Sequence, residues 1–199
     1  MTLVAHDNTK VDLLEWAEYR VKSRTINTRE EAGDLALPYG VAVAVRAIRP
    51  DDAPALQRLY GRLSKQSIHL RFFSYMKQLP DHTAKHLACV DGFNRFALVA
   101  LDPDDPDEII AVVRYDRQPP GDERAEYAAL VEDRWQGLGI GTALTRRLIE
   151  AARDKGVRSF YALVMGENKR MLNIFRHLGL HERERREDGE KMVEIGLSS

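Results

Sequence analysis

The sequence predicts an α/β fold of the α+β type, with a mixed, mostly antiparallel sheet flanked by helices. Three apolar segments at 96–100, 109–115 and 126–131 are separated by short polar turns, and strands joined in this way pair antiparallel. A helical pattern beginning at Ile140 separates strand 126–131 from a further strand at 159–164, and such a crossover makes its two strands parallel. With 199 residues, 44% of them hydrophobic, the chain is long enough to bury a substantial core.

By pattern the chain divides into an N-terminal extension, residues 1–40, and a folded domain, residues 41–199. In the extension, the partly apolar segment 11–22 favours a helix, and residues 25–40 are expected to form a loop. The domain opens with an alternating strand at 41–48.

Helices follow this first strand. Arg49-Pro50 ends the strand, and Asp51 is a good N-cap for the first helix. The helices expected before the next strand lie at 53–63, 64–76 and 81–89.

Turns and one more helix complete the domain. Residues 102–107 read as a solvated hairpin loop, and residues 118–122 as the turn into strand 126–131. The helix after strand 159–164 begins at Asn168 and stops at Gly179, and the tail at 192–197 alternates as a last strand.

The glycine-rich stretch between strand 126–131 and the following helix is the most informative part of the chain. A strand-to-helix turn made of glycines leaves the first N–H groups of the helix free, at the positive end of its macrodipole. No Cβ blocks a close ligand, so the turn predicts a phosphate cradle. Its residues are Gln136, Gly137, Leu138, Gly139, Ile140, Gly141 and Thr142.

The spacing of the glycines distinguishes between several kinds of phosphate cradle. A P-loop needs Gly-Lys-Ser/Thr after its spacer, and no Lys is present here. The dinucleotide fingerprint has glycines at positions one, three and six, whereas Gly137, Gly139 and Gly141 alternate. Glu167 does follow the next strand, where a ribose-binding acid would lie, so that interpretation stays open, as does an ordinary glycine-rich turn.

The pattern Gln-x-x-Gly-x-Gly resembles the acyl-CoA pyrophosphate loop of the GNAT N-acetyltransferase superfamily, and the element order resembles the GNAT fold over residues 41–197. A second motif, from Asn168 to Leu180, resembles the family's other cofactor element. The resemblance implies that Asn168 contacts the pantetheine arm. The family usually has a tyrosine, proposed to protonate the leaving thiolate, where this chain has Phe175, so that role falls elsewhere.

In the family, the end of the strand before the loop splays from its neighbour and exposes backbone groups to the thioester. The resemblance assigns this part to Ala129, Leu130 and Val131. Attack on the thioester also needs a neutral amine, and a carboxylate can take its proton.

Glu126 is the best candidate for this base, and Glu123 is its nearest rival. The segment 125–128 resembles a catalytic-glutamate strand of bacterial Pat-type protein lysine acetyltransferases. The alternative is a solvent-facing glutamate on the sheet.

A third block, Ser64 to Phe73, also resembles Pat-type domains. Ser64 is expected to cap a helix on which Ser67 and Arg71 share a face that borders the acceptor cleft. A capped helix with a surface arginine and core phenylalanines explains the same residues equally well.

The expected function is therefore acetyl-CoA-dependent transfer of an acetyl group to a primary amine, foremost a protein lysine, for example on an acyl-CoA synthetase. A small-amine acetyltransferase and a non-catalytic acyl-CoA sensor remain alternatives, and Phe175 favours the sensor. An oligomer is left open. The net charge of −1 gives no reason to expect nucleic acid, and no apolar run reaches membrane-spanning length. The single Cys89 fits a reducing cytoplasm, and the scattered histidines predict no metal site.

Overall fold

The structure is a computed structural model that describes residues 33–37, 40–72, 76–165, 168–180, 182–187 and 190–197. The helix expected at 11–22 and Glu167 lie outside the described residues. Within the described ranges, no helix is both long and apolar enough to cross a bilayer.

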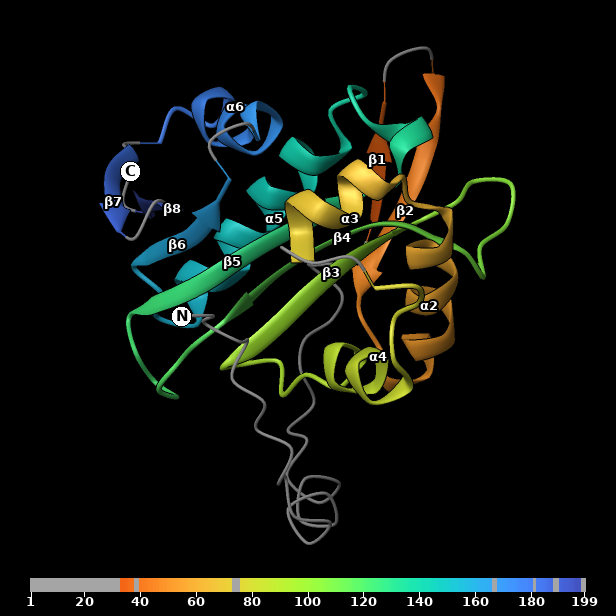
Figure 1. The fold of residues 1–199 in the computed structure, drawn as a ribbon, viewed down its shortest axis with the longest axis horizontal. Helices are drawn as coiled ribbons and strands as arrows, with labels where there is room; N and C mark the ends of the chain where they lie inside the picture. Colours follow the sequence, from red (N-terminus) through yellow and green to blue (C-terminus); the bar gives the residue numbers. More distant parts are fainter. Residues whose placement is uncertain are drawn as a thin grey trace, which may run out of the picture.

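An eight-stranded sheet forms the centre of the described part, in the order β1-β2-β3-β4-β5-β6-β8-β7 (Figure 1). Neighbouring strands are antiparallel except β5 and β6, which are parallel on either side of helix α5. This confirms the fold class and the single parallel pair that the crossover predicts. The strands are β1 (Gly33–Ala36), β2 (Ala42–Ala47), β3 (Arg95–Leu101), β4 (Ile109–Asp116), β5 (Arg124–Val131), β6 (Ser159–Val164), β7 (Glu182–Glu187) and β8 (Glu190–Gly196).

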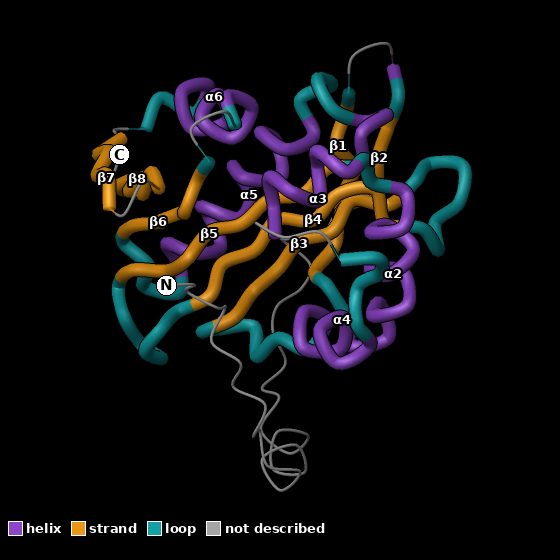
Figure 2. Tube along the Cα trace, viewed as in Figure 1, coloured by secondary structure: helices purple, strands orange, loops and turns teal. Residues whose placement is uncertain are grey.

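Helices cover both faces of the sheet (Figure 2). Helices α5 and α6 pack on one face over the larger apolar cluster, and α2, α3 and α4 pack on the other over a second cluster. On β5, Tyr127 faces the first cluster and Leu130 the second, as the two-residue period of a strand requires. The helices are α2 (Ala53–Arg62), α3 (Lys65–Phe72), α4 (Asp81–Ala88), α5 (Ile140–Asp154) and α6 (Lys169–His177), with 3-10 turns η2 (Pro50–Asp52) and η3 (Asp133–Trp135).

Helix α5 is held on the sheet by its apolar stripe. Ile140, Leu144 and Leu148 recur at helical spacing and are all buried. Burying each such side chain stabilises the fold by about 1.5–3 kcal/mol, so α5 holds the glycine loop on a rigid base.

The expected loop at 25–40 is partly wrong, because residues 33–36 form β1. Leu35 pairs with Val43 of β2 and is 8% exposed, so it adds to the apolar cluster under α5. A four-residue strand carries too short a pattern to detect, and pairing with β2 decides it. The division of the chain at residue 40 stays a prediction.

Strand β7 is a second difference, since no strand was expected at 182–187. Its residues are charged, and it pairs antiparallel with β8 at the end of the sheet order. Edge strands tolerate charged residues, so the hydrophobic pattern that reveals inner strands is lacking.

The expected cap at Asp51 is also wrong. Asp51 lies inside the turn η2, and Asp52 precedes the first residue of α2. The Asp52 carboxylate accepts two hydrogen bonds of 2.7 Å from Arg46 and one of 2.7 Å from Arg49 N–H. It therefore holds strand β2 to the turn instead of capping α2.

Candidate active site

Strands β5 and β6 separate partway along their length. They pair from Arg124 with Ser159 to Glu126 with Tyr161, and no further. Beyond that point β5 stays paired with β4 and β6 with β8. Residues 127–131 therefore present an open backbone edge, and this edge includes the three residues expected to splay.

Ala129 directs both of its backbone groups into this opening. Glu132 N–H donates to Ile110 O on the β4 side at 2.8 Å, and backbone groups alternate between the two sides of a strand. Leu130 thus bonds toward β4, whereas Ala129 and Val131 direct N–H and C=O toward the opening. An N–H in this place can hydrogen-bond a carbonyl oxygen that lies between the strands.

The glycine loop lies directly after this edge and leads into α5. Gly137 and Gly139 have φ of 80° and 85°, a left-handed conformation that favours glycine, and both are exposed. The first hydrogen bond of α5 runs from Ala143 N–H to Gly139 O at 3.0 Å. The N–H groups of residues 140–142 therefore have no helical acceptor. This arrangement fits an anionic phosphate group.

Gly141 has a different task from the other two glycines. A Cβ added there would lie 3.2 Å from Ile174 Cδ1 and 3.5 Å from Val131 Cγ2. The lack of a side chain lets α5, α6 and the end of β5 approach closely. Leu138 and Thr142 are partly buried, and Ile140 belongs to the core.

Gln136 connects the loop to its surroundings. Its Nε2 donates to Val131 O at 2.8 Å and to Ser67 Oγ at 3.2 Å, and its Oε1 accepts from Arg170 of α6. Because these bonds all go to protein atoms, Gln136 shapes the loop. Its direct contact with a cofactor stays a prediction.

Asp133 is a residue that the sequence did not single out. Its carboxylate accepts three hydrogen bonds of 2.8 Å, from Ser64 N–H, Ser64 Oγ and Ser67 Oγ. Ser64 Oγ also accepts from Ser67 N–H at 3.1 Å, so Ser64 caps α3 as expected. Burial raises the pKa of Asp133, but these hydrogen bonds outweigh it and hold the pKa below its usual value. The Ser-x-x-Ser spacing thus fastens α3 to the start of the glycine loop.

Asn168 and Phe175 both have structural roles in α6. Asn168 Oδ1 accepts from Met171 N–H at 3.1 Å and caps the helix. Phe175 is fully buried and packs edge-on against Tyr127, with ring centroids 5.3 Å apart. The hydroxyls of Tyr127 and Thr145 lie 2.6 Å apart, and burial raises the pKa of this tyrosine. Neither aromatic side chain is placed to give a proton to a thiolate.

Glu126 is exposed on the face of the sheet that carries α2, α3 and α4. It lies opposite Asp116 of β4 and Tyr161 of β6, at the last pair before the strands separate. Burial lowers the pKa of Arg71 and brings that of Arg114 to about 9, and the Glu126 carboxylate opposes both shifts. Glu126 is therefore an exposed acid close to two basic side chains, at the mouth of the opening.

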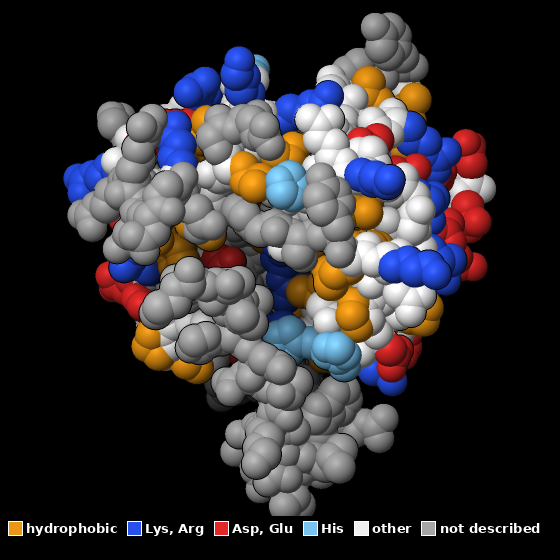
Figure 3. All heavy atoms as spheres, viewed as in Figure 1, with side chains coloured by type: hydrophobic (Ala, Val, Ile, Leu, Met, Phe, Trp, Pro, Cys, Tyr) orange, Lys and Arg blue, Asp and Glu red, His pale blue; other side chains and the backbone are white. Residues whose placement is uncertain are grey.

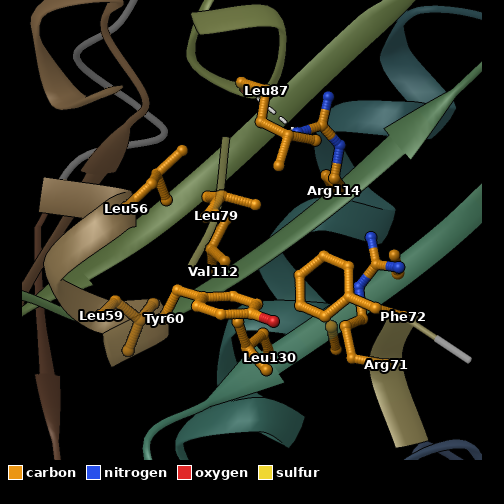
Figure 4. A pocket seen from close by; sticks show the side chains of 12 residues that line it. Leu56, Leu59, Tyr60, Arg71, Phe72, Leu79, Leu87, Val112, Arg114 and Leu130 are labelled. Atoms are coloured by element: carbon orange, nitrogen blue, oxygen red, sulfur yellow. Dashed lines mark hydrogen bonds between the residues drawn. The ribbon is translucent and has the colours of Figure 1, made fainter. Parts of the chain in front are cut away.

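A small cavity of about 30 Å³ lies on the same face of the sheet, lined by residues of β4 and β5 and of the helices over them (Figure 4). Apolar side chains line most of it, chiefly from α2 and β5 with single residues from α3, α4 and β4, together with the side chains of Arg71 and Arg114. Figure 3 shows Lys or Arg atoms recessed in the middle of this face of the molecule. The cavity reaches Ala128, Ala129 and Leu130, so it adjoins the open edge of β5.

Comparisons with known proteins agree with this geometry. The profile of the Acetyltransferase (GNAT) family matches residues 64–180. Acetyltransferase PA5475 of Pseudomonas aeruginosa is 29% identical over 145 residues, which cover 72% of this chain and 77% of that protein. Acetyltransferase Pat of Mycolicibacterium smegmatis is 32% identical over 140 residues, which cover 68% of this chain and 40% of that protein.

Solved structures of acyltransferases are also similar to this chain. The GNAT domain of S. lividans PAT superposes with a TM-score of 0.77 at 32% identity, over 84% of this chain and 97% of that domain. A cAMP-binding acyltransferase from Mycobacterium smegmatis superposes with a TM-score of 0.59 at 24% identity, over 94% of this chain and 53% of that one, and shows the fold alone.

Proposed function

This chain belongs to the GNAT acetyltransferase family, and we propose that it transfers an acetyl group from acetyl-CoA to the side-chain amine of a protein lysine. Acetyl transfer with acetyl-CoA as cosubstrate is the activity of the family. The protein acceptor is supported by the similarity to the Pat acetyltransferase and to the GNAT domain of PAT. The match covers 40% of the length of the Pat relative. A protein lysine as the acceptor of this chain is therefore a proposal.

The single observation that carries the proposal is the open edge of β5 directly before the free N–H groups of α5. The pyrophosphate of acetyl-CoA binds the N–H groups of residues 140–142, and Gly137 and Gly139 let it approach the backbone. The thioester then lies along the opening, where Ala129 N–H hydrogen-bonds its carbonyl oxygen. A donor aimed at a developing oxyanion contributes about 3 kcal/mol to a reaction of this type.

Glu126 makes the acceptor amine reactive. A lysine amine with a pKa near 10.4 is neutral in roughly one molecule per two thousand at pH 7. Glu126 takes its proton, directly or through one water, as the nitrogen attacks the thioester carbon. The new C–N bond forms, the C–S bond breaks, and the CoA thiolate takes its proton from solvent. Phe175 has no proton to give, and the hydroxyl of Tyr127 is bound to Thr145.

Glu126→Gln tests the base. The substitution keeps the shape of the side chain and removes its basicity, so turnover at pH 7 should fall by about 10²–10⁴-fold. Acetyl-CoA affinity should stay unchanged, because the carboxylate is not needed by the pyrophosphate, and part of the lost rate should return at high pH. Glu123→Gln is the matched control, since Glu123 is also exposed and lies just before the same strand. Wild-type turnover of Glu126→Gln would remove the base from this mechanism.

Mass spectrometry of an acyl-CoA synthetase incubated with the enzyme and acetyl-CoA tests the acceptor. Acetylation of specific lysines by the wild type, and its loss with Glu126→Gln, is the expected result. Thiol release with polyamines or amino acids and none with protein lysines would instead identify a small-amine acetyltransferase. Acetyl-CoA binding without thiol release from any acceptor would identify a sensor.

A further inference from the structure

The cavity contains a buried guanidinium group, that of Arg114, with one nitrogen that lacks a hydrogen bond among the described residues. Arg114 is 7% exposed, and its Nη1 donates to Leu87 O at 3.0 Å. Its Nη2 is buried and has no hydrogen-bond partner among the described residues. Asp116 Oδ2 lies 3.7 Å away, beyond hydrogen-bond reach, and accepts from Arg95 Nε at 3.0 Å. An unpaired buried donor of this kind costs free energy unless a ligand satisfies it.

A second guanidinium faces the same cavity from another element. Arg71 of α3 is partly buried and lies over the ring of Phe72, with its Cζ 5.1 Å from the ring centroid. Among the residues that the structure describes, it forms no hydrogen bond or ion pair. The charge of Arg71 also lowers the pKa of Arg114, so the two groups repel each other. Figure 4 shows both side chains on one side of the cavity, Arg114 from β4 and Arg71 from α3.

Glu126 does not neutralise the two arginines by direct contact. Its charge acts on both arginines, yet neither forms an ion pair with it within the described part of the chain. Arg114 has only the 3.7 Å ion pair with Asp116, and Arg71 has no ion pair among the described residues. Two cations in a mostly apolar cavity that share this one distant carboxylate favour a further anion from outside the chain. A guanidinium fork matches a carboxylate with two parallel hydrogen bonds.

We propose that Arg71 and Arg114 bind a carboxylate of the acceptor, supplied by an acidic side chain beside the acceptor lysine. The inference rests on the proposed lysine acetyltransferase function and names the acceptor sequence that the site prefers. The cavity of about 30 Å³ suits the few atoms of a carboxylate. It also lies at the right place, because Ala128 lines it two residues after Glu126 on the same face of β5, about 7 Å along the strand. A lysine amine at Glu126 and a neighbouring carboxylate at the arginines can therefore be held together.

The test uses two lysine peptides that differ only in one residue beside the lysine, glutamate in one and glutamine in the other. Thiol release measures kcat/KM for each with the full chain. The wild type should prefer the glutamate peptide by about 10- to 100-fold, the range for a hydrogen bond to a charged group. Arg71→Gln should abolish the preference. Arg124→Gln is the matched control, because Arg124 is an exposed arginine of β5 outside the cavity, and it should keep the preference.

Binding gives a readout that does not depend on turnover. Fluorescence anisotropy of the two labelled peptides in the presence of CoA should show the same preference and its loss in Arg71→Gln. Arg114→Lys, which keeps a charge but not the fork, is the second variant and should weaken the preference. Melting curves of each variant establish that it is folded.

The outcomes separate this inference from the proposed function. If both peptides are acetylated and bound equally by the wild type, the carboxylate site is refuted while the lysine acetyltransferase stands. If neither peptide is acetylated but the glutamate peptide binds tighter through Arg71, the site stands and the proposed function fails. A third outcome is that the enzyme acetylates free lysine faster than lysinamide, which lacks the α-carboxylate, but acetylates the two peptides equally. The site would then bind the carboxylate of a small acceptor, and the proposal of an acidic residue beside a protein lysine would be wrong.

Discussion

Asp133→Asn should loosen the junction between α3 and the glycine loop. The carboxylate accepts three hydrogen bonds of 2.8 Å, two on Oδ1 and one on Oδ2. An asparagine amide has only one oxygen that accepts hydrogen bonds. Its NH₂ group would replace the second carboxylate oxygen and would face an N–H or O–H donor there. At least one of the bonds from Ser64 and Ser67 is therefore lost.

The size of the effect follows from these contacts. A hydrogen bond to a charged group contributes about 1.5–3 kcal/mol, and the partial exposure of Asp133 reduces that value. We expect the free energy of unfolding to fall by about 1–3 kcal/mol, which corresponds to roughly 2–12 °C in Tm for a chain of this length. Because Ser67 also accepts from Gln136, the glycine loop should loosen too, and the KM for acetyl-CoA should rise.

The pH dependence has a definite sign. Hydrogen bonds hold the pKa of Asp133 below its unfolded value, which is near 3.9 for a model peptide. Its contribution is therefore complete above the unfolded pKa and is lost as the pH falls through the lower, folded pKa. The gap in stability between wild type and Asp133→Asn should be largest near pH 7 and should shrink as the pH falls below about 4.

Urea unfolding at pH 7 and at several values below pH 4 measures both effects. Asp104→Asn is the control, since Asp104 lies exposed in the 102–107 loop, and its free energy of unfolding should stay within about 0.5 kcal/mol of wild type. A gap for Asp133→Asn smaller than 0.5 kcal/mol at pH 7, on the same scale, would refute the reasoning. So would a gap that does not change on acidification.

Three further substitutions test the loop and the core. Gly139→Glu should abolish acetyl-CoA binding in calorimetry, because φ is 85° there and a carboxylate would meet the phosphates; unchanged binding would mean that the cradle is misassigned. Phe175→Ala should lower the free energy of unfolding by about 3–5 kcal/mol in urea titrations, and a loss below 1 kcal/mol would contradict its place in the core. Thr145→Val should cost about 1–3 kcal/mol by leaving the buried Tyr127 hydroxyl unpaired, and adding Tyr127→Phe should recover part of that cost; strictly additive losses would argue against the bond.

Much of the fold could be predicted from local pattern. Alternation and helical spacing depend on residues within a few positions of each other, so the strands from β2 to β6 and helices α5 and α6 were found. The rule for crossover connections then required the parallel pairing of β5 with β6. Strands β1 and β7 were missed, since one is short and the other carries charges in place of an apolar face.

Some residues of the candidate site could also be predicted from the sequence, and others could not. The glycine loop, Glu126 and Asn168 were identified because each belongs to a contiguous motif, and their binding and catalytic roles stay predictions. Asp133 carried no such signal, since its partner Ser64 is 69 residues away in sequence.

What the sequence determined by itself is the order of the elements, the free N–H groups at the start of α5 and the position of an acid on β5. Only the tertiary structure decided which charged side chains are buried and which of them have hydrogen-bond partners. Arg114 looks like any other arginine along the chain, yet folding buries it beside Arg71 and leaves its Nη2 without a hydrogen-bond partner among the described residues. Burial and pairing depend on distant elements that pack together, whereas strand and helix patterns depend on neighbours in the chain. For that physical reason, the sequence could reveal the loop for the cofactor, but the candidate site for the acceptor emerged only from the packing of α3 against the sheet.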